Sequence, residues 1–267
     1  MAADLKHGFA IHVRSLKAQY RSILEYPADF WVMAVSGLFN QITTFAFLAV
    51  LFGAVDSIAG WSFHEMLILV VYMRMSGAFV AIGWDGIWNL SHMVVDGDLD
   101  YRLTRPAPVV SQVASSFVGL QAFGDIAVGI VMLWVGWTGV GLGLDPATLG
   151  IALVLFVSAI GIQIGVITSL NCICFWIRGR ATPIAFAAVE LQNNVGNYPL
   201  KIYPGVVKAL LTFGLPFAFI NYIPAQILTG RLPMVWTLAP PLAALVALAI
   251  MALILRAGLR TYESAGH

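Results

Sequence analysis

The residues whose types and spacing could support chemistry are concentrated in one short stretch, VVDGDLDYRLTRPAPVV, at residues 94–110. Three aspartates and two arginines crowd together there: Asp96, Asp98, Asp100, Arg102 and Arg105. The alternating aspartates look like the start of a calcium-binding EF-hand loop, which needs Gly at its sixth position and Glu at its twelfth. Those positions hold Tyr101 and Ala107. We therefore expect no metal site in this stretch, and its charges need another explanation.

The other reactive residue types form no pattern typical of a catalytic or metal site. Cys172 and Cys174 are two positions apart, so on a helix they point in different directions and cannot pair with each other. A lone C-x-C without a nearby histidine is also a poor zinc site. No H-E-x-x-H, nucleophile-elbow or P-loop pattern occurs. We expect no catalytic residue and no cofactor bound by this chain, and no ATP hydrolysis through a P-loop of its own.

The composition places these residues in a membrane protein. Of the 267 residues, 60% are hydrophobic and only 10% are charged, whereas an ordinary soluble domain has about 25% charged residues. One globular core cannot hide this much apolar surface, so the lipid bilayer must solvate much of it. The net charge of +1 gives no indication of nucleic-acid binding, and we expect none. We expect a single transmembrane domain over residues 1–267.

The hydropathy pattern predicts an all-α polytopic membrane protein with six transmembrane helices, because a spanning helix needs about 20 mostly apolar residues. The expected spans are Phe30–Gly53, Phe63–Trp84, Val113–Val140, Ala147–Trp176, Arg180–Tyr198 and Leu238–Leu255. Unpaired amides and carboxylates are costly against lipid tails, so we expect the polar groups of the first and fifth spans to line a substrate route. These groups are Asn40, Thr44, Glu190, Asn193, Asn194 and Asn197. The alternative, that they only join helices, stays open.

Residues 1–27 are expected to form an amphipathic helix on the membrane surface. Its apolar side chains share one arc: Leu5, Phe9, Val13, Leu16, Tyr20, Ile23 and Leu24. Its basic side chains lie on or beyond the edge of that arc: Lys6, Arg14, Lys17 and Arg21. A basic amphipathic helix suits the cytoplasmic lipid surface, although packing on the protein itself remains an alternative.

Residues 199–233 are apolar but are interrupted by five prolines. Because proline breaks helices, and lipid tolerates broken backbone only where protein or water covers it, we expect a re-entrant hairpin of two short helices before the last span. We expect this hairpin to close the outer end of the substrate route. Its gate residues would be Pro204, Pro216, Phe217 and Pro224.

The distribution of Lys and Arg predicts the orientation. With the N-terminus inside, ten basic residues fall on the inner side: Lys6, Arg14, Lys17, Arg21, Arg102, Arg105, Arg178, Arg180, Arg256 and Arg260. Only Lys201, Lys208 and Arg231 fall on the outer side. The loop at residues 85–108 is therefore expected to be cytoplasmic.

Three ionisable residues lie inside the expected spans: Arg74, Asp125 and Glu190. Such residues are suspected of function by default, because a charge in lipid is costly. They either pair with one another to lock helix packing or belong to a transport route, and the sequence leaves both interpretations open. Gly161 and Gly165 have the spacing of closely packed membrane helices, and we expect a structural role for them.

Together these motifs resemble the permeases of type 2 ABC exporters. The match is closest to a bacterial subfamily with a G-x-L-D-x-x-L-x-R-P loop after the second span, which corresponds here to Gly97, Leu99, Asp100, Leu103, Arg105 and Pro106. The later motifs Y-P-L-x-x-Y-P and P-x-A-F-I-x-Y-x-P-A are similar to residues 198–204 and 216–225. The resemblance covers nearly the whole chain.

The resemblance implies a multi-pass subunit of a bacterial cell (inner) membrane exporter. It implies ABC ATPase subunits as separate partners that hold Mg-ATP, and a second permease, identical or homologous. The loop would then couple this chain to the ATPase through Trp88, Asp96, Gly97, Asp98, Leu99, Asp100, Arg102, Arg105 and Pro106. We expect its apolar contacts with the ATPase to come from Ile87, Trp88, Leu90 and Val94. Pro106 restrains Arg105, and Gly97 can start a tight turn, so the loop would be rigid.

Two other function classes remain as alternatives. A secondary transporter or channel would more often show broken helices at corresponding positions of two halves, and here only the late region is broken. A lipid-modifying membrane enzyme would need acid, base or nucleophile groups at one membrane face, where only the Asp/Arg loop qualifies. The substrate is expected to be a small amphiphile, such as an antibiotic, a lipid or a peptide.

Overall fold

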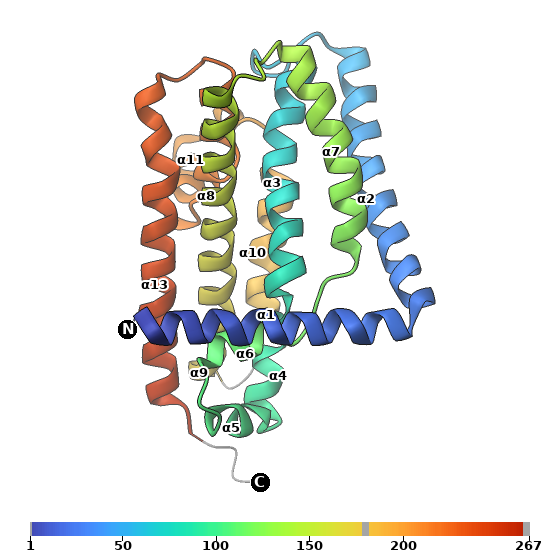
Figure 1. The fold of residues 1–267 in the computed structure, drawn as a ribbon. Helices are drawn as coiled ribbons and strands as arrows, with labels where there is room; N and C mark the ends of the chain where they lie inside the picture. Colours follow the sequence, from blue (N-terminus) through green and yellow to red (C-terminus); the bar gives the residue numbers. More distant parts are fainter. Residues whose placement is uncertain (1, 178–181, 264–267) are drawn as a thin grey trace.

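The computed structural model describes residues 2–177 and 182–263. These residues form helices and turns, and the described part of the chain contains no β-strand. Long helices stand side by side, and the N-terminal helix lies across one end of them (Figure 1). Five helices of the described chain are long and apolar enough to cross a membrane. The expected all-α polytopic membrane fold is confirmed.

The five long helices begin and end with recognisable local signals. They are α2 (Pro27–Ala54), α3 (Phe63–Trp84), α7 (Gln121–Val140), α8 (Pro146–Asn171) and α13 (Ala239–Thr261). Prolines stand in the first turns of α2, α8 and α13, where no backbone N–H is needed. Ser62 and Glu65 form a capping box at the start of α3.

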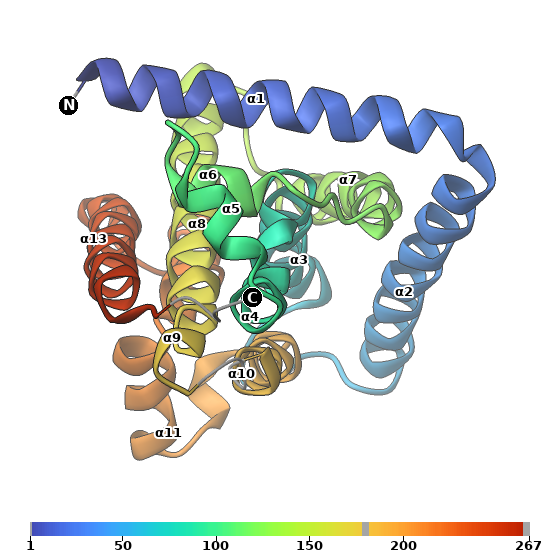
Figure 2. The ribbon, with the colours of Figure 1, turned by 90° about the horizontal axis from the view of Figure 1, so that it is seen from below.

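Helix α3 is the centre of the bundle. Its residues Met66–Met73 are almost completely buried, and it packs against α7 on one side and α8 on the other. α2 packs on α7, and α13 packs on α8, so these two helices stand at opposite edges (Figure 2). Inside, Gln163 of α8 donates a 2.6 Å hydrogen bond to the hydroxyl of Ser76 in α3. A satisfied buried amide of this kind fixes the register of two apolar helices.

Glycines allow the outer helices to approach the central ones. A Cβ atom on Gly165 would come within 2.9 Å of Ala247 in α13, and a Cβ on Gly161 would lie 3.3 Å from Ala244. The expected packing role of the Gly161 and Gly165 pair is therefore confirmed. Gly124 likewise allows α7 to approach α2 closely, because a Cβ atom at this position would overlap the carbonyl oxygen of Ala34.

The third span is shorter than the sequence predicts. Helix α6 (Val109–Ala114) is separate, and α7 begins only at Gln121, so the expected span Val113–Val140 is wrong at its start. Ser115 and Ser116 bond their hydroxyls to backbone carbonyls of α6 at 2.6 and 2.7 Å, which favours a helix end. The chain then docks on α3 through the Gly119 N–H, which donates to Ala81 O at 3.0 Å.

The expected fifth span, Arg180–Tyr198, begins in residues outside the described chain. Its described part forms helix α10 (Thr182–Val195), which ends three residues before Tyr198. The helix ends where Gly196 lies against Met73, in the middle of α3. Pro199 prevents its continuation.

Where the sequence predicts a re-entrant hairpin, two short helical segments are bent by 72° at Leu215 and Pro216. The first is α11 (Gly205–Ala209) with η3 (Leu210–Gly214), and the second is η4 (Phe217–Phe219) with α12 (Tyr222–Leu228). α11 lies at the periphery of the bundle (Figure 2).

Helix α12 packs against the first part of α3, whereas α10 packs against α8. The Tyr222 ring lies 5.6 Å from Trp61, just before α3, and Arg231 forms a 2.7 Å ion pair with Glu65 in its first turn. The two short helical segments bent at Leu215 and Pro216 lie where the sequence predicts the re-entrant hairpin. The hairpin follows α10 and precedes the last long helix, α13.

Helix α1 (Ala2–Glu25) lies across the bundle end, which we call the α1 end (Figures 1 and 2). It packs on the protein through small and polar residues: the rings of His12 and Trp84 are 5.2 Å apart, and Ser15 donates to Ser115 O at 3.3 Å. Packing on the protein and contact with the lipid surface are compatible for this helix. Phe9 and Leu24 are exposed, and at 100° per residue they lie on a different side of the helix from His12 and Ser15.

Candidate functional site

The connection between α3 and α7 includes the lowest helix drawn in Figure 1. It contains η1 (Asp85–Asn89), α4 (Leu90–Val95), α5 (Asp98–Leu103) and α6. α4 and α5 present apolar and charged side chains together: Tyr101 is 65% exposed, Val95 52% and Leu103 42%. We call this the α5 surface, and its exposed members are Val95, Asp96, Asp98, Tyr101, Leu103, Arg105 and Pro106.

A tight turn and one buried side chain hold α5 in place. Gly97 joins α4 to α5 with φ of 80°, a left-handed conformation that glycine adopts without strain. Leu99 is completely buried and packs in a cluster that includes Leu90, Val113 and Cys172. The motif residues Gly97 and Leu99 therefore shape and anchor the α5 surface from behind.

Two polar side chains tie α5 to α6. Arg102 donates from Nη1 to Gln112 O at 2.8 Å, and the Gln112 amide donates back to Arg102 O at 3.0 Å. The same amide donates to Ala107 O at 3.0 Å. These three bonds hold together the two ends of the segment that contains Arg105 and Pro106. Arg102 is only partly exposed, and its role is to position the α5 surface.

Asp100 and Arg105 face different neighbours. Asp100 faces the C-terminal end of α13, where burial, and next the Asp100 carboxylate, raise the pKa of Tyr262 to about 12. Arg105 lies over the Tyr101 ring with its Cζ 4.3 Å from the centroid, and its hydrogen bond and charge lower the pKa of that tyrosine. A cation held over an aromatic ring forms one compact exposed unit.

Three residues between α3 and α5 do not belong to this surface. Ile87 and Leu90, which we expected to offer apolar contacts to a partner, are 2% and 1% exposed and pack inside the chain. Their expected contact role is therefore wrong, because the short helices turn these side chains towards α8 and α9 (Cys174–Ile177). Trp88 lines a cavity with Glu190 and Asn193.

A second group of polar residues gathers around Arg74, midway along α3. Its Nη1 atom donates to Asn40 Oδ1 in α2 at 3.4 Å, and the charges of Asp125 in α7 and Glu190 in α10 act on it. Glu190 in turn accepts a 3.2 Å hydrogen bond from Asn194. One guanidinium thus connects four helices of the bundle through charge or hydrogen bonding.

Some of the residues that we expected to line the substrate route lie in the polar group around Arg74, namely Asn40, Glu190 and Asn194. Asn40 and Thr44 lie one helical turn apart on α2, and the Thr44 hydroxyl donates to Asn40 O at 3.2 Å. Asn197, beyond the end of α10, has a buried side-chain oxygen without a hydrogen-bond partner among the described residues.

A polar cavity of about 330 Å³ lies at the α1 end, between η1, the start of α7 and α10. Its polar lining residues are Asp85, Asn89, Gln121, Glu190 and Asn193. Glu190 belongs both to this cavity and to the group around Arg74. The cavity therefore continues the polar group towards the α1 end.

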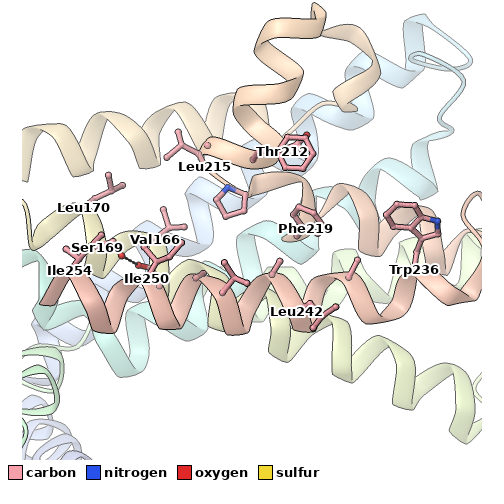
Figure 3. A pocket seen from close by; sticks show the side chains of 18 residues that line it. Val166, Ser169, Leu170, Thr212, Leu215, Phe219, Trp236, Leu242, Ile250 and Ile254 are labelled. Atoms are coloured by element: carbon pink, nitrogen blue, oxygen red, sulfur yellow. Dashed lines mark hydrogen bonds between the residues drawn. The ribbon is translucent and has the colours of Figure 1, made fainter. Parts of the chain in front are cut away.

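An apolar cavity of about 600 Å³ lies between α8, α13 and the bent segments (Figure 3). Val166, Phe219 and Leu242 border it, and its Ser169 hydroxyl is already bonded to Gly165 O at 2.6 Å. Of the expected gate residues, Pro216 lines this cavity and Phe217 and Pro224 are buried. Pro204 is exposed at the start of α11.

Sequence reasoning missed Asp85 and left the roles of Arg74 and Asp125 open. The signal for Arg74 and Asp125 was their charge inside an apolar span, which marks a functional candidate. Asp85 lies at the end of α3 and looked like an ordinary loop residue. Only the packing of α10 beside η1 places it in a cavity.

The comparisons with known proteins agree with this architecture. A family model described as "ABC-2 family transporter protein" matches residues 38–266, which is most of the chain. No curated protein matches the chain, and no solved structure matches it. With its apolar helices and a family match over more than half its length, this chain belongs to the ABC-2 family of transporter membrane proteins.

Proposed function

We propose that this chain is the permease subunit of an ATP-driven exporter in the bacterial cell membrane. Two permeases, identical or homologous, would form the pathway, and separate ATPase subunits holding Mg-ATP would drive it. Family membership supports the permease role. The observation that carries the coupling mechanism is the α5 surface, where exposed Tyr101 and Leu103 stand beside Asp98 and Arg105 on a rigid support.

The α5 surface has the composition of a protein interface. Interface centres are enriched in aromatic residues and arginine, with charged groups at the rim. Tyr101 and Arg105 stack on each other at 4.3 Å, so they lose little conformational entropy on binding. The proposed partner is a soluble ATPase, because the distribution of Lys and Arg predicts that this end is cytoplasmic.

The support of the α5 surface explains how movement would be transmitted. α5 is bonded to α6 through Arg102 and Gln112, and Gly86 of η1 lies against the backbone of α6. η1 follows α3 directly, and Trp84 at the end of α3 donates to Thr168 of α8 at 3.0 Å. A push on α5 would therefore act on α3, α7 and α8 together.

The polar residues between α2, α3 and α10 support the proposed location of the pathway. Only 17% of the residues in the apolar part of α2 are buried, and Asn40, Glu190 and Asn194 are exposed in the single chain. Exposed polar groups inside a membrane need a partner or water. A second permease facing α2 and α10 would enclose them.

The experiment is affinity purification of the membrane complex through a tag on this chain. Arg105→Ala should reduce the recovered ATPase subunit by more than about tenfold, because losing one partner of an interfacial charge pair costs about 2–5 kcal/mol. Arg260→Ala removes an exposed charge from the end of α13 and should leave the recovery unchanged.

Two outcomes would contradict the proposal. If both arginine variants recover the same amount of ATPase, the α5 surface is not the coupling site. If the unaltered chain transports an amphiphile and never recovers an ATPase, it acts as a secondary transporter or channel.

A further inference from the structure

The polar cavity contains a carboxylate that the rest of the chain does not neutralise. Asp85 is half-buried, and its carboxylate forms no hydrogen bond or ion pair with a residue in the described part of the chain. The charges of Asp125 and Glu190 act on the Arg74 guanidinium, and no Lys or Arg is among the described residues that line the cavity. Two carboxylates, Asp85 and Glu190, therefore line a cavity without a cationic side chain among these residues, and an unpaired charge away from bulk water is costly.

The cavity also has an aromatic wall. Trp88, Phe117 and Phe186 line it together with Asp85 and Glu190. Tryptophan binds a cation over its ring face better than the other aromatic residues do, most strongly where water is excluded. Rings combined with carboxylates select an organic cation, whereas a metal ion would need several oxygen ligands converging at one point.

The size and position of the cavity fit a small cargo molecule. Its volume of about 330 Å³ lies at the lower end of the range for small-molecule pockets. It lies at the α1 end, the same end as the α5 surface, and Glu190 belongs both to its lining and to the polar group around Arg74. A molecule held there would lie at the inner end of the proposed pathway.

We propose that this cavity is the loading site for an organic cation with an apolar body, such as a quaternary ammonium or phosphonium compound. Asp85 and Glu190 neutralise its charge, and Trp88 faces it. The inference rests on the proposed function and names the substrate class of the same pathway. It also gives Trp88 a role in binding the cargo, separate from the contact with the ATPase.

The test is direct binding of radiolabelled tetraphenylphosphonium to the full chain in lipid nanodiscs, with the signal of empty nanodiscs subtracted. Triphenylphosphine oxide has a similar aryl body without a net charge and serves as the competitor. We expect Asp85→Asn and Glu190→Gln each to raise the Kd of the cation by about tenfold or more. Trp88→Leu should raise it about threefold, and Trp88→Phe should restore most of the affinity.

The matched control is Glu25→Gln, which removes an exposed carboxylate of α1 at the same end and should leave the Kd unchanged. Thermal unfolding in the same nanodiscs separates lost binding from lost folding, and Trp88→Phe keeps the test meaningful if Trp88→Leu unfolds. The proposal is overturned if triphenylphosphine oxide competes as well as unlabelled tetraphenylphosphonium does. It is also overturned if folded Asp85→Asn and Glu190→Gln variants bind normally.

The binding test uses no ATPase, so its failure is distinguishable from that of the proposed function. Normal ATPase recovery without cation binding would refute the substrate class alone. Cation binding without any recovered ATPase would instead refute the exporter assignment.

Discussion

Asn221 donates a 2.7 Å hydrogen bond from its side-chain amide to the backbone carbonyl of Gly196, and the bond is buried. It joins the end of α10 to the start of α12 beside Met73, at the middle of α3. A broken helix leaves backbone groups without partners, and inside a membrane these must be satisfied by protein. This one bond therefore stabilises the junction between the end of α10 and the start of α12.

We expect Asn221→Leu to lower the free energy of unfolding by about 1–3 kcal/mol, because the Gly196 carbonyl would stay buried and lose a partner. Denaturant unfolding in detergent measures this difference. Asn194→Leu is the comparison, since Asn194 is exposed and bonds only Glu190, and it should change stability by about 0.5 kcal/mol or less. Equal losses in the two variants would refute the junction role.

Gly97→Ala should strain the turn between α4 and α5. A residue with a Cβ costs about 1–2 kcal/mol in the left-handed region that Gly97 occupies at φ of 80°. We expect weaker ATPase recovery together with a lower unfolding temperature. Gly150→Ala, placed in the open near the start of α8, should be neutral or slightly stabilising. An unaltered Gly97→Ala complex would show that the turn geometry is not needed.

Gly124→Ala should separate α2 from α7, because its Cβ would overlap the Ala34 carbonyl oxygen. Overpacking of this kind typically costs about 1–3 kcal/mol. Gly53→Ala in α2 meets no atom within 4 Å and is the matched control. The readout is the thermal unfolding midpoint, and a loss in the control as large as in Gly124→Ala would contradict the close α2–α7 contact.

Membrane orientation can be tested by cysteine labelling in intact cells with an impermeant maleimide. Asp56→Cys in the exposed α2–α3 loop should react from outside, and Asp98→Cys on the α5 surface should react only after permeabilisation. Cys172 and Cys174 are both 0% exposed, so they can remain in place. Labelling at position 98 but not at position 56 would reverse the orientation and remove the basis for ATPase coupling.

The sequence alone predicted the membrane class, the long helices and the turn motif at residues 96–106. Long apolar segments must form helices in lipid, whatever their neighbours, because each backbone group needs an internal partner. The conformation of Gly97 and the burial of Leu99 agree with a rigid loop.

Helix ends and surface contacts depended on neighbours distant in sequence. Residues 113–120 are apolar enough to extend α7, yet Gly119 bonds to Ala81 of α3 instead. Ile87 and Leu90 looked available to a partner until α8 and α9 covered them. An apolar segment is equally suited to the lipid and to the protein interior. Hydropathy alone therefore does not tell which of these two environments surrounds it.

The polar sites were decided entirely by tertiary structure. Asp85 and Glu190 are separated by more than a hundred residues, and they line one cavity only because α10 packs beside η1. Arg74 becomes the centre of a charged group because α2, α7 and α10 each place a polar side chain near α3. Residue type and spacing identify charges that need partners, whereas the three-dimensional packing of helices determines which partners they have.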